Sequence, residues 1–379
     1  MHIIVLEKEP SSSRGGQELS LLDVCCGLSQ RGHSISLLFV KEGDLLKYYQ
    51  SFCVQIVNVN GYTINWRKPT TSVNLFTDIW QVVKRENSVV YVNEYRDSLF
   101  GSLLALFKNM PLVCHLRLPP FKEALSIQQT IGVKGIKRFI AISNQTKLDW
   151  VNKGFKKDMI DVVHNGINLE LFKPSEKLST AREEWNIPEH TKIILYVGRL
   201  NKEKGLETLI NAFALLLKKG IKARLLIAGK PLWNLSPEMG EEYRKSLKQL
   251  SIALGVEKHV DFLGHVTNTA SLYQLSDVTV LPSIWAEPFG RVVIESMACG
   301  TPVVASRIGG IPEILTGEFQ SGLFEPGNAE DLSATLSYVM NWKDTSPALS
   351  EKCREHVIHN FRVDRMVDGV EKILLKVLK

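Results

Sequence analysis

A short apolar strand, a turn that contains glycine and an amphipathic helix follow one another along this chain, and the series begins twice. The first series starts at residues 2–7 (HIIVLE) and the second at residues 192–200 (KIILYVGRL). This alternation is typical of a doubly wound parallel sheet. The chain has 379 residues, 44% of them apolar, which is more than one hydrophobic core usually absorbs. We therefore predict two α/β domains, each built on a parallel sheet.

A polar stretch separates the two series. Pro174 and Pro188 interrupt residues 168–190, which indicates a linker with a short helix. We expect the first domain to span residues 1–170 and the second domain to span residues 171–359.

The two ends of the chain and its apolar runs bear on its location. Residues 353–379 carry apolar side chains at helical spacing and predict one terminal helix. No apolar run reaches the length of about 18 residues that a spanning helix needs, and the amino terminus lacks the regions of a signal peptide. The six cysteines form no CxxC pair, which is typical of a reducing compartment. We expect a cytoplasmic protein, and peripheral contact with the inner face of the membrane stays open.

Basic residues slightly outnumber acidic residues. The 46 Lys and Arg against 40 Asp and Glu give a formal net charge of +6. This excess favours anionic ligands or an anionic membrane surface, although it is small and a solvated basic surface is the simpler interpretation. No zinc-ligand spacing, basic helix or aromatic-basic RNA signature occurs, so we expect no nucleic-acid partner.

Two glutamates eight residues apart form the most informative motif. Glu287 precedes the turn Pro288, Phe289 and Gly290, and Glu295 falls inside the helix predicted to follow, about 8 Å along its axis. Two such carboxylates can accept hydrogen bonds from hydroxyls at opposite ends of one extended ligand. The backbone amides of the turn, at a helix amino end, suit an anionic group. A solvated helix face is the alternative interpretation.

Residues 287–306 (EPFGRVVIESMACGTPVVAS) and the glycines 309–310 resemble the E-x7-E signature of the family 4 retaining glycosyltransferases. The resemblance covers nearly the whole chain. It implies the GT-B fold, in which two Rossmann-like domains face each other across a cleft and a C-terminal helix, here about residues 360–379, crosses back to the N-terminal domain. It also implies that Glu295 binds the donor ribose and Glu287 the hydroxyls of the transferred sugar. The same resemblance adds these donor contacts: Pro288, Phe289, Gly290 and Arg291.

Arg199 and Lys204 flank a turn between strand and helix within residues 196–210 (YVGRLNKEKGLETLI). Two prepositioned cations can stabilise the charge that develops on a leaving diphosphate, although cations at this spacing also occur as simple surface residues. The segment resembles the G-R-x4-K-G diphosphate site of the family, which implies that both residues hold the donor without a metal. We expect either alanine replacement to abolish transfer and to leave the fold intact.

Two positions in the first half complete the expected site. Gly15 and Gly16 lie between the first strand and helix, where glycine lets the backbone approach a ligand. In the family, a glycine pair at this place approaches the donor phosphate. His115, in the segment PLVCHLR and followed by Arg117, matches a histidine that family members carry near the reacting sugar. The resemblance implies that His115 orients the sugar or the acceptor.

Contacts to the nucleotide base are expected in the second half. By resemblance, the backbone around Gly229 and around His265 and Val266 holds the base. Backbone contacts do not identify a base, so both UDP- and GDP-sugars stay open. Lys147 is a further candidate for reaching a phosphate or an acceptor anion, with a surface lysine as the alternative.

The resemblance implies a retaining hexosyltransferase that acts on a nucleotide diphosphate sugar by front-face displacement. The acceptor is a hydroxyl of a glycan, a lipid or a small molecule. No cofactor is expected, and no DxD pair or histidine-rich cluster indicates a catalytic metal. The alternatives are a GT-B sugar-nucleotide epimerase or phosphorylase, and a noncatalytic scaffold that binds nucleotide sugars.

The acceptor itself is not identified by any motif. Residues 116–138 predict a long loop, and loops commonly determine specificity. One hypothesis is that basic residues of this loop rest on a membrane that holds a lipid-linked acceptor. These residues are Lys122, Lys134, Lys137 and Arg138.

Overall fold

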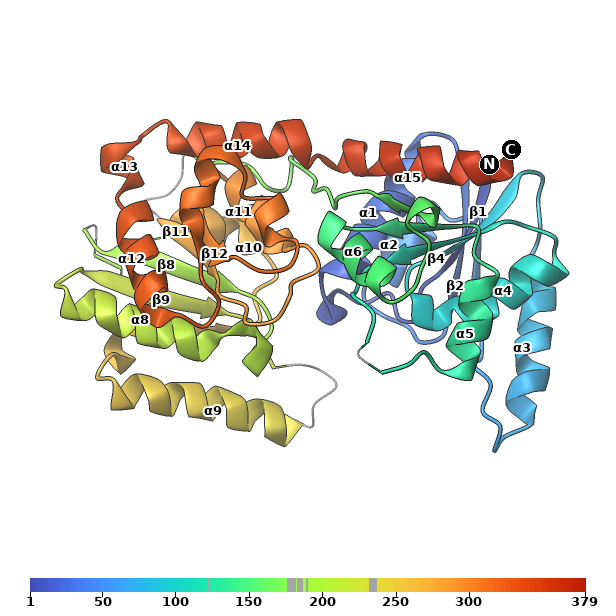
Figure 1. Cartoon of the computed structure of the whole chain (residues 1–379), viewed down its shortest axis with the longest axis horizontal. Coiled ribbons are helices and arrows are strands. Elements are labelled where there is room, and N and C mark those ends of the chain that lie inside the picture. The colour runs from blue at the N-terminus through green and yellow to red at the C-terminus, as the bar shows by residue number, and fades with distance from the viewer. Residues whose placement is uncertain (122, 176–181, 183–186, 189, 232–236) are drawn as a thin grey trace. The chain divides into compact units, whose positions relative to one another are not determined.

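The computed structural model describes residues 1–121, 123–175, 182, 187–188, 190–231 and 237–379, so Lys122 and parts of the expected linker lie outside the described residues. The chain divides into two compact units (Figure 1). Met1–Gly166 and Val363–Lys379 form the first unit, and Ile167–Arg362 form the second.

The first unit contains a seven-stranded parallel sheet within the described residues, in the order β3-β2-β1-β4-β5-β6-β7. Its strands are β1 (His2–Leu6), β2 (Ser34–Phe39), β3 (Gln55–Asn58), β4 (Ser88–Val92), β5 (Leu112–Leu116), β6 (Arg138–Ala141) and β7 (Ile160–Val162). Leu6 aligns with Leu38 on one side and with Val92 on the other. The strand order reverses between β1 and β4, and doubly wound sheets bind ligands at the carboxyl ends of the strands at such a point.

Helices cover both faces of this sheet. They are α1 (Gly16–Gln30), α2 (Leu46–Gln50), α3 (Thr70–Gln81), α4 (Ser98–Phe107), α5 (Ile127–Lys134), α6 (Asn144–Asn152) and α15 (Val363–Leu378). Ile3 and Val5 belong to the core that includes side chains of α1 and α15, whereas Ile4 and Leu6 belong to the core under α3 and α4. All five residues of β1 are buried because a parallel strand covered on both faces must be apolar throughout. Figure 1 shows α15 lying along α1.

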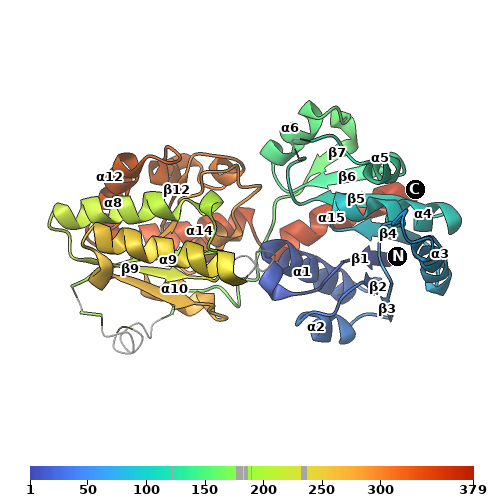
Figure 2. The same ribbon diagram turned by 90° about the horizontal axis from the view of Figure 1, so that it is seen from below.

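The second unit repeats this architecture with six parallel strands among the described residues, in the order β10-β9-β8-β11-β12-β13. The strands are β8 (Lys192–Val197), β9 (Ala223–Ala228), β10 (Val260–Gly264), β11 (Val278–Leu281), β12 (Val303–Ser306) and β13 (Leu323–Phe324). The helices are α8 (Leu206–Lys218), α9 (Pro237–Ala253), α10 (Thr269–Leu275), α11 (Arg291–Ala298), α12 (Ala329–Val339), α13 (Trp342–Thr345) and α14 (Leu349–Asn360). Helix α8 packs between α9 and α12 on one face of the sheet (Figure 2).

The C-terminal helix expected at about residues 360–379 is α15, but residues 353–379 as a whole do not form one helix. Helices α14 and α15 are separated at Phe361 and Arg362. Phe361 leaves the helical conformation with a φ of −133°, and its carbonyl oxygen accepts a hydrogen bond of 3.0 Å from the amide of Ile167. Ile167 also forms a parallel β-bridge with Arg362. This contact across the sequence explains the break, because the bridge requires extended backbone.

The segment 116–138 is also more ordered than the predicted loop. It contains α5, whose amino end is capped by a reciprocal capping box of Ser126 and Gln129. Arg138, the last residue of the segment, is the first residue of β6. The Arg138 guanidinium pairs with the Asp161 carboxylate at 2.6 Å, so one of the four expected membrane-facing cations has a partner within the sheet. None of the helices among the described residues combines the length and the apolar character needed to cross a bilayer.

Candidate active site

The turn that carries Arg199 and Lys204 follows β8 in the second unit. A one-turn helix, η4 (Lys202–Lys204), ends at Gly205, which has a φ of 64°. A Cβ on Gly205 would lie 2.0 Å from the carbonyl oxygen of Pro282, so a larger residue cannot occupy this position without displacing the turn. The amide of Ile284 donates to the Glu203 carbonyl oxygen at 2.9 Å. The turn is therefore fixed against the carboxyl end of β11.

Lys204 and Glu287 form a buried ion pair. Lys204 is 9% exposed and Glu287 is 7% exposed, and the Lys204 Nζ contacts the Glu287 Oε1. The Ser283 hydroxyl donates to the same carboxylate oxygen. Burial alone would raise the pKa of Glu287, but the Lys204 charge and the hydrogen bonds from Lys204 and Ser283 hold the pKa below its ordinary value. Glu287 is therefore an ionised carboxylate, and the structure brings together two residues that the sequence assigned to separate ligand groups.

The glycines 309–310 hold the loop that contains Glu287. Gly309 has a φ of 62°, and a Cβ there would lie 2.2 Å from the Glu287 carbonyl oxygen. The Gly310 amide donates to that same oxygen at 2.7 Å. The glycine pair thus lets two loops touch through their backbones, which gives a physical reason for this part of the motif.

Glu295 lies inside α11, one turn after Arg291. The Arg291 Nε lies 2.8 Å from the Glu295 Oε1, and the buried Tyr273 hydroxyl donates to the Oε2 at 2.9 Å. Burial and the Glu295 charge both raise the pKa of Tyr273, so its hydroxyl stays protonated and remains a donor. Each carboxylate oxygen keeps further lone-pair capacity for a ligand hydroxyl. Glu295 is thus oriented by two fixed partners.

The three residues before Arg291 contribute mainly through the backbone. Gly290 precedes α11 with a φ of 103°, a conformation that favours glycine. The Phe289 side chain is 2% exposed and packs edge-on against Phe361, with ring centroids 5.8 Å apart. Pro288 has no amide hydrogen, so among Pro288, Phe289 and Gly290 only the last two offer backbone donors.

Arg199 is half-buried and precedes Lys204 on the same turn. Its carbonyl oxygen accepts from the Tyr196 hydroxyl at 2.7 Å, which fixes the backbone. In the part of the chain that the structure describes, its guanidinium forms no ion pair or hydrogen bond. The candidate residues Arg199, Lys204 and Arg291 carry three positive charges against the two of Glu287 and Glu295, so the group has a net charge suited to an anion.

The expected base-binding segments meet at the carboxyl ends of β8, β9 and β10. The Gly229 amide donates to the Gly264 carbonyl oxygen at 2.7 Å, and a Cβ on Gly229 would lie 1.8 Å from the Gly198 carbonyl oxygen. His265 is exposed and Val266 is half-buried directly after this contact. The structure therefore brings these positions together through backbone contacts with one another, and their contact with a base stays a prediction.

In the first unit, the glycines 15–16 begin α1. Gly15 has a φ of 134° and a ψ of −159°, and no atom lies within 4 Å of where its Cβ would be. The backbone conformation, rather than space, therefore requires glycine at this position.

His115 lies within β5 and is fully buried. Its Nδ1 and the Tyr91 hydroxyl are 2.5 Å apart, while its Nε2 is buried without a hydrogen-bond partner. Burial first, and then the Arg117 charge, holds the pKa of His115 well below its ordinary value, so the ring is neutral. Lys147, the other basic candidate, donates its Nζ to the Ile160 carbonyl oxygen at 2.5 Å.

A buried polar network at the switch point of the first sheet was not identified from the sequence. Glu7, Asn93 and Arg117 are the first residues after β1, β4 and β5. Asn93 donates to Glu7 at 2.7 Å and accepts from the Arg117 Nε at 2.9 Å. Their positions in the sequence could have indicated this network, because each of these polar residues directly follows an apolar strand.

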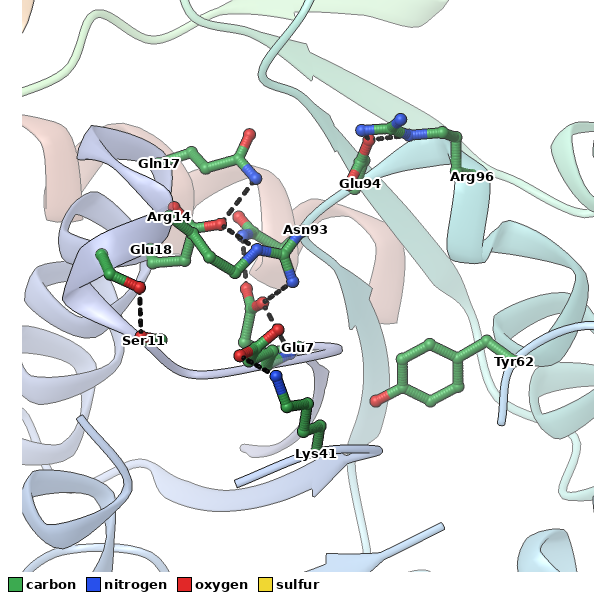
Figure 3. Close-up of polar contacts among 12 residues, drawn as sticks. Glu7, Ser11, Arg14, Gln17, Glu18, Lys41, Tyr62, Asn93, Glu94 and Arg96 are labelled. Atoms are coloured by element: carbon green, nitrogen blue, oxygen red, sulfur yellow. Dashed lines mark hydrogen bonds and ion pairs between the residues drawn. The ribbon is translucent and has the colours of Figure 1, made fainter. Parts of the chain in front are cut away.

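The same network extends into α1. Arg14 lies between the carboxylates of Glu7 and Glu18 (Figure 3), with its Nε 3.2 Å from the Glu18 Oε1. Burial raises the pKa of both carboxyl groups. The Glu18 Oε2 and the Arg117 Nη2 are buried without hydrogen-bond partners. A buried acceptor and a buried donor in one network thus have no partner in the described protein, so a water molecule, an ion or a ligand can meet them.

No group of three or more His, Cys, Asp and Glu side chains suited to holding a metal ion occurs among the described residues.

Comparisons with known proteins cover both units. Residues 14–171 match the model described as Glycosyltransferase Family 4, and residues 179–356 match the model described as Glycosyl transferases group 1. The chain is 34% identical to the D-inositol 3-phosphate glycosyltransferase of Corynebacterium glutamicum, over 94% of this chain and 90% of that protein. It is 27% identical to the N-acetyl-alpha-D-glucosaminyl L-malate synthase of Bacillus anthracis, over 93% of this chain and 91% of that protein.

Solved structures share the fold. Anabaena Alr3699/HepE, in complex with UDP and glucose, superimposes with a TM-score of 0.84 at 22% identity, over 99% of this chain and all of that chain. A glycosyltransferase from Rickettsia africae gives the same TM-score at 25% identity, over 100% of this chain and 98% of that chain.

Proposed function

The chain belongs to the family 4 glycosyltransferases and has the predicted GT-B fold, and we propose that it transfers a hexosyl unit from a nucleotide diphosphate sugar to a hydroxyl group with retention of configuration. The observation that carries this proposal is the buried Lys204–Glu287 pair beside Arg199. An ionised carboxylate and cations on neighbouring turns are the groups that a sugar and a diphosphate require.

The donor occupies the carboxyl ends of the strands in the second unit. Arg199 and Lys204 bind the diphosphate, whose charge grows as the glycosidic bond breaks, and fixed cations stabilise that charge without reorganisation. Glu287 accepts hydrogen bonds from the sugar hydroxyls, and Glu295 accepts from the ribose. The segments around Gly229 and His265 contact the base.

We further propose front-face displacement. The acceptor oxygen attacks the anomeric carbon on the side from which the diphosphate leaves, and a diphosphate oxygen takes the acceptor proton. The lowered pKa of Glu287 and its pairing with Lys204 support this, because a paired carboxylate of low basicity is a poor nucleophile and a poor general base. Glu295 is likewise held by Arg291 and Tyr273.

The acceptor binds to the first unit, at the network of Glu7, Arg14, Glu18 and Arg117. The unpartnered Arg117 Nη2 is a donor and the unpartnered Glu18 Oε2 is an acceptor. A hydroxyl group of the acceptor can accept a hydrogen bond from the first atom or donate one to the second. Two relatives are named for hydroxyl-bearing small molecules, D-inositol 3-phosphate and L-malate, and we propose a small polyhydroxylated or hydroxy-acid acceptor as the first class to test.

The test is a transfer assay with panels of UDP- and GDP-sugars and of hydroxylated acceptors, followed by NMR of the product anomeric centre. We expect nucleoside diphosphate release that depends on the acceptor, retention at the anomeric carbon, and unchanged rates in a chelator. A product with inverted configuration refutes the front-face mechanism. A sugar nucleotide of changed ring configuration without transfer indicates an epimerase, and tight donor binding without turnover indicates a scaffold.

A further inference from the structure

Helix α3 in the first unit has apolar side chains on two opposite faces. Leu75 and Ile79 are buried against the core of the sheet. Val73, Phe76 and Trp80, at helical spacing on the other face, are 64%, 41% and 74% exposed. A surface helix with one partner normally carries polar residues on its outer face, and this second apolar face departs from that pattern.

The exposed face continues onto the end of α4. The rings of Phe76 and Phe107 meet edge to face with centroids 5.4 Å apart, and the adjacent Leu106 is 73% exposed. We name the five side chains Val73, Phe76, Trp80, Leu106 and Phe107 the α3 patch. Contiguous exposed apolar side chains of this kind mark interaction surfaces. Both views show α3 on the outside of the first unit (Figures 1 and 2).

Cations surround the α3 patch. The Lys108 ammonium lies 4.9 Å from the centroid of the Trp80 ring, and Lys84 donates to the Asn109 carbonyl oxygen at 3.2 Å, which places it at the end of α4. Further cations flank α3 in the chain, namely Arg67, Lys68 and Arg85. The acids in the same segments are Asp78 and Glu86, and Asp78 is buried and accepts hydrogen bonds from Asn60. The surface around the patch is therefore positive.

We propose that the α3 patch docks on the surface of a bilayer that contains anionic lipids. Exposed Trp and Phe side chains occupy the boundary between headgroups and acyl chains, and Lys and Arg beside them meet the lipid phosphates. A second copy of this chain fits less well, because a two-fold interface would bring the same cations face to face. This surface is distinct from the segment 116–138, and it is independent of the proposed transfer reaction.

The experiment is flotation of the full-length protein with vesicles of phosphatidylcholine alone and of phosphatidylcholine mixed with phosphatidylglycerol. The test variant is Phe76→Ser/Trp80→Ser. The matched control is Tyr338→Ser, which removes a 72% exposed aromatic from the second unit. A second comparison tests the cations: Lys84→Gln/Lys108→Gln removes two of them beside the α3 patch. Its control, Lys258→Gln, removes the charge of an exposed lysine in the second unit. Thermal unfolding and donor turnover with a soluble acceptor show that each variant is folded.

We expect wild type and Tyr338→Ser to float with anionic vesicles only, and Phe76→Ser/Trp80→Ser to bind at least about tenfold more weakly, since inserting an aromatic side chain is worth about one order of magnitude or more. Lys84→Gln/Lys108→Gln weakens binding and Lys258→Gln does not. Absence of wild-type flotation overturns the proposal, and so does equal flotation of the test variant and Tyr338→Ser. A dimer in analytical ultracentrifugation that the test variant abolishes, without vesicle binding, assigns the patch to a contact between copies instead.

Discussion

Replacing Lys204 with methionine should cost both stability and activity, for separate reasons. The substitution keeps the length of the side chain and removes the ammonium group beside Glu287, which is 7% exposed. Removing one member of a buried ion pair typically destabilises a protein by about 3–5 kcal/mol. This buried pair changes the expectation from sequence that loss of Lys204 leaves the fold intact.

The acid chemistry of Glu287 limits this cost and makes it depend on pH. Without Lys204, burial raises the pKa of Glu287, and the carboxyl escapes the unpaired charge by taking a proton. Protonating a carboxyl of ordinary pKa, about 4.3, costs about 4 kcal/mol at pH 7 and about 1 kcal/mol at pH 5. In wild type the folded pKa is lowered, so the stabilisation is present above the unfolded pKa and is lost as the pH falls. The destabilisation by Lys204→Met should therefore shrink as the solution is acidified.

The assay is thermal unfolding of the full-length protein at pH 7 and pH 5, with nucleoside diphosphate release measured in parallel. At about 2–4 °C per kcal/mol, Lys204→Met should lower Tm by about 8–16 °C at pH 7 and by about 2–4 °C at pH 5. Lys204→Met/Glu287→Gln should recover most of the Tm, because no unpaired charge remains buried. The kcat of both variants should fall about 10²–10³-fold, since each lacks the diphosphate cation.

Lys202→Met is the matched control, because Lys202 is exposed in the same one-turn helix. A Tm of Lys204→Met at pH 7 equal to that of Lys202→Met would refute the buried-pair argument. A normal kcat in Lys204→Met would refute the diphosphate role, whatever the Tm.

Three further predictions test other parts of the structure. Arg199→Ala should reduce kcat at least about 100-fold, because a cation that stabilises the leaving diphosphate is lost. Its Tm should stay within about 2 °C of wild type, because the half-buried guanidinium has no ion-pair partner among the described residues. A large loss of Tm would contradict this expectation. Gly309→Ala should lower Tm and turnover, because the new Cβ would lie 2.2 Å from the Glu287 carbonyl oxygen. The control Gly317→Ala has a similar φ but no atom within 4 Å of the new Cβ, so it should lower Tm less. Burial and the nearby Glu94 raise the pKa of Asp97 to about 7, so the stability that Asp97 contributes is present at low pH and is lost as the pH rises through 7. Asp97→Asn should therefore flatten the decline of Tm between pH 5 and pH 8. An unchanged dependence of Tm on pH would contradict the raised pKa of Asp97.

The fold was predictable because strand, turn and helix alternate with clear periodicity in both halves. The E-x7-E and G-R-x4-K-G segments likewise identified turns that the structure places at the carboxyl ends of strands. The helix break at Phe361 was not predictable, since both Phe361 and Arg362 fit a helical pattern and the break depends on Ile167, far away in the sequence.

The partners of the candidate site residues were also not predictable. Lys204 and Glu287 are 83 residues apart, and no local pattern indicates that they form a buried ion pair. The network of Glu7, Asn93 and Arg117 joins three strand ends through single side chains that belong to no motif. Such groups become visible only when the sheet order is known.

The β-bridge between Ile167 and Arg362 has a consequence for how such a chain can be divided. The second unit enters at Ile167 and leaves at Arg362, so its two ends meet in one hydrogen-bonded pair. Topologically, the second unit is an insertion between Gly166 and Val363 of the first. A unit whose two ends lie side by side can be excised or exchanged as one cassette at two neighbouring junctions, and the first unit then keeps its last helix.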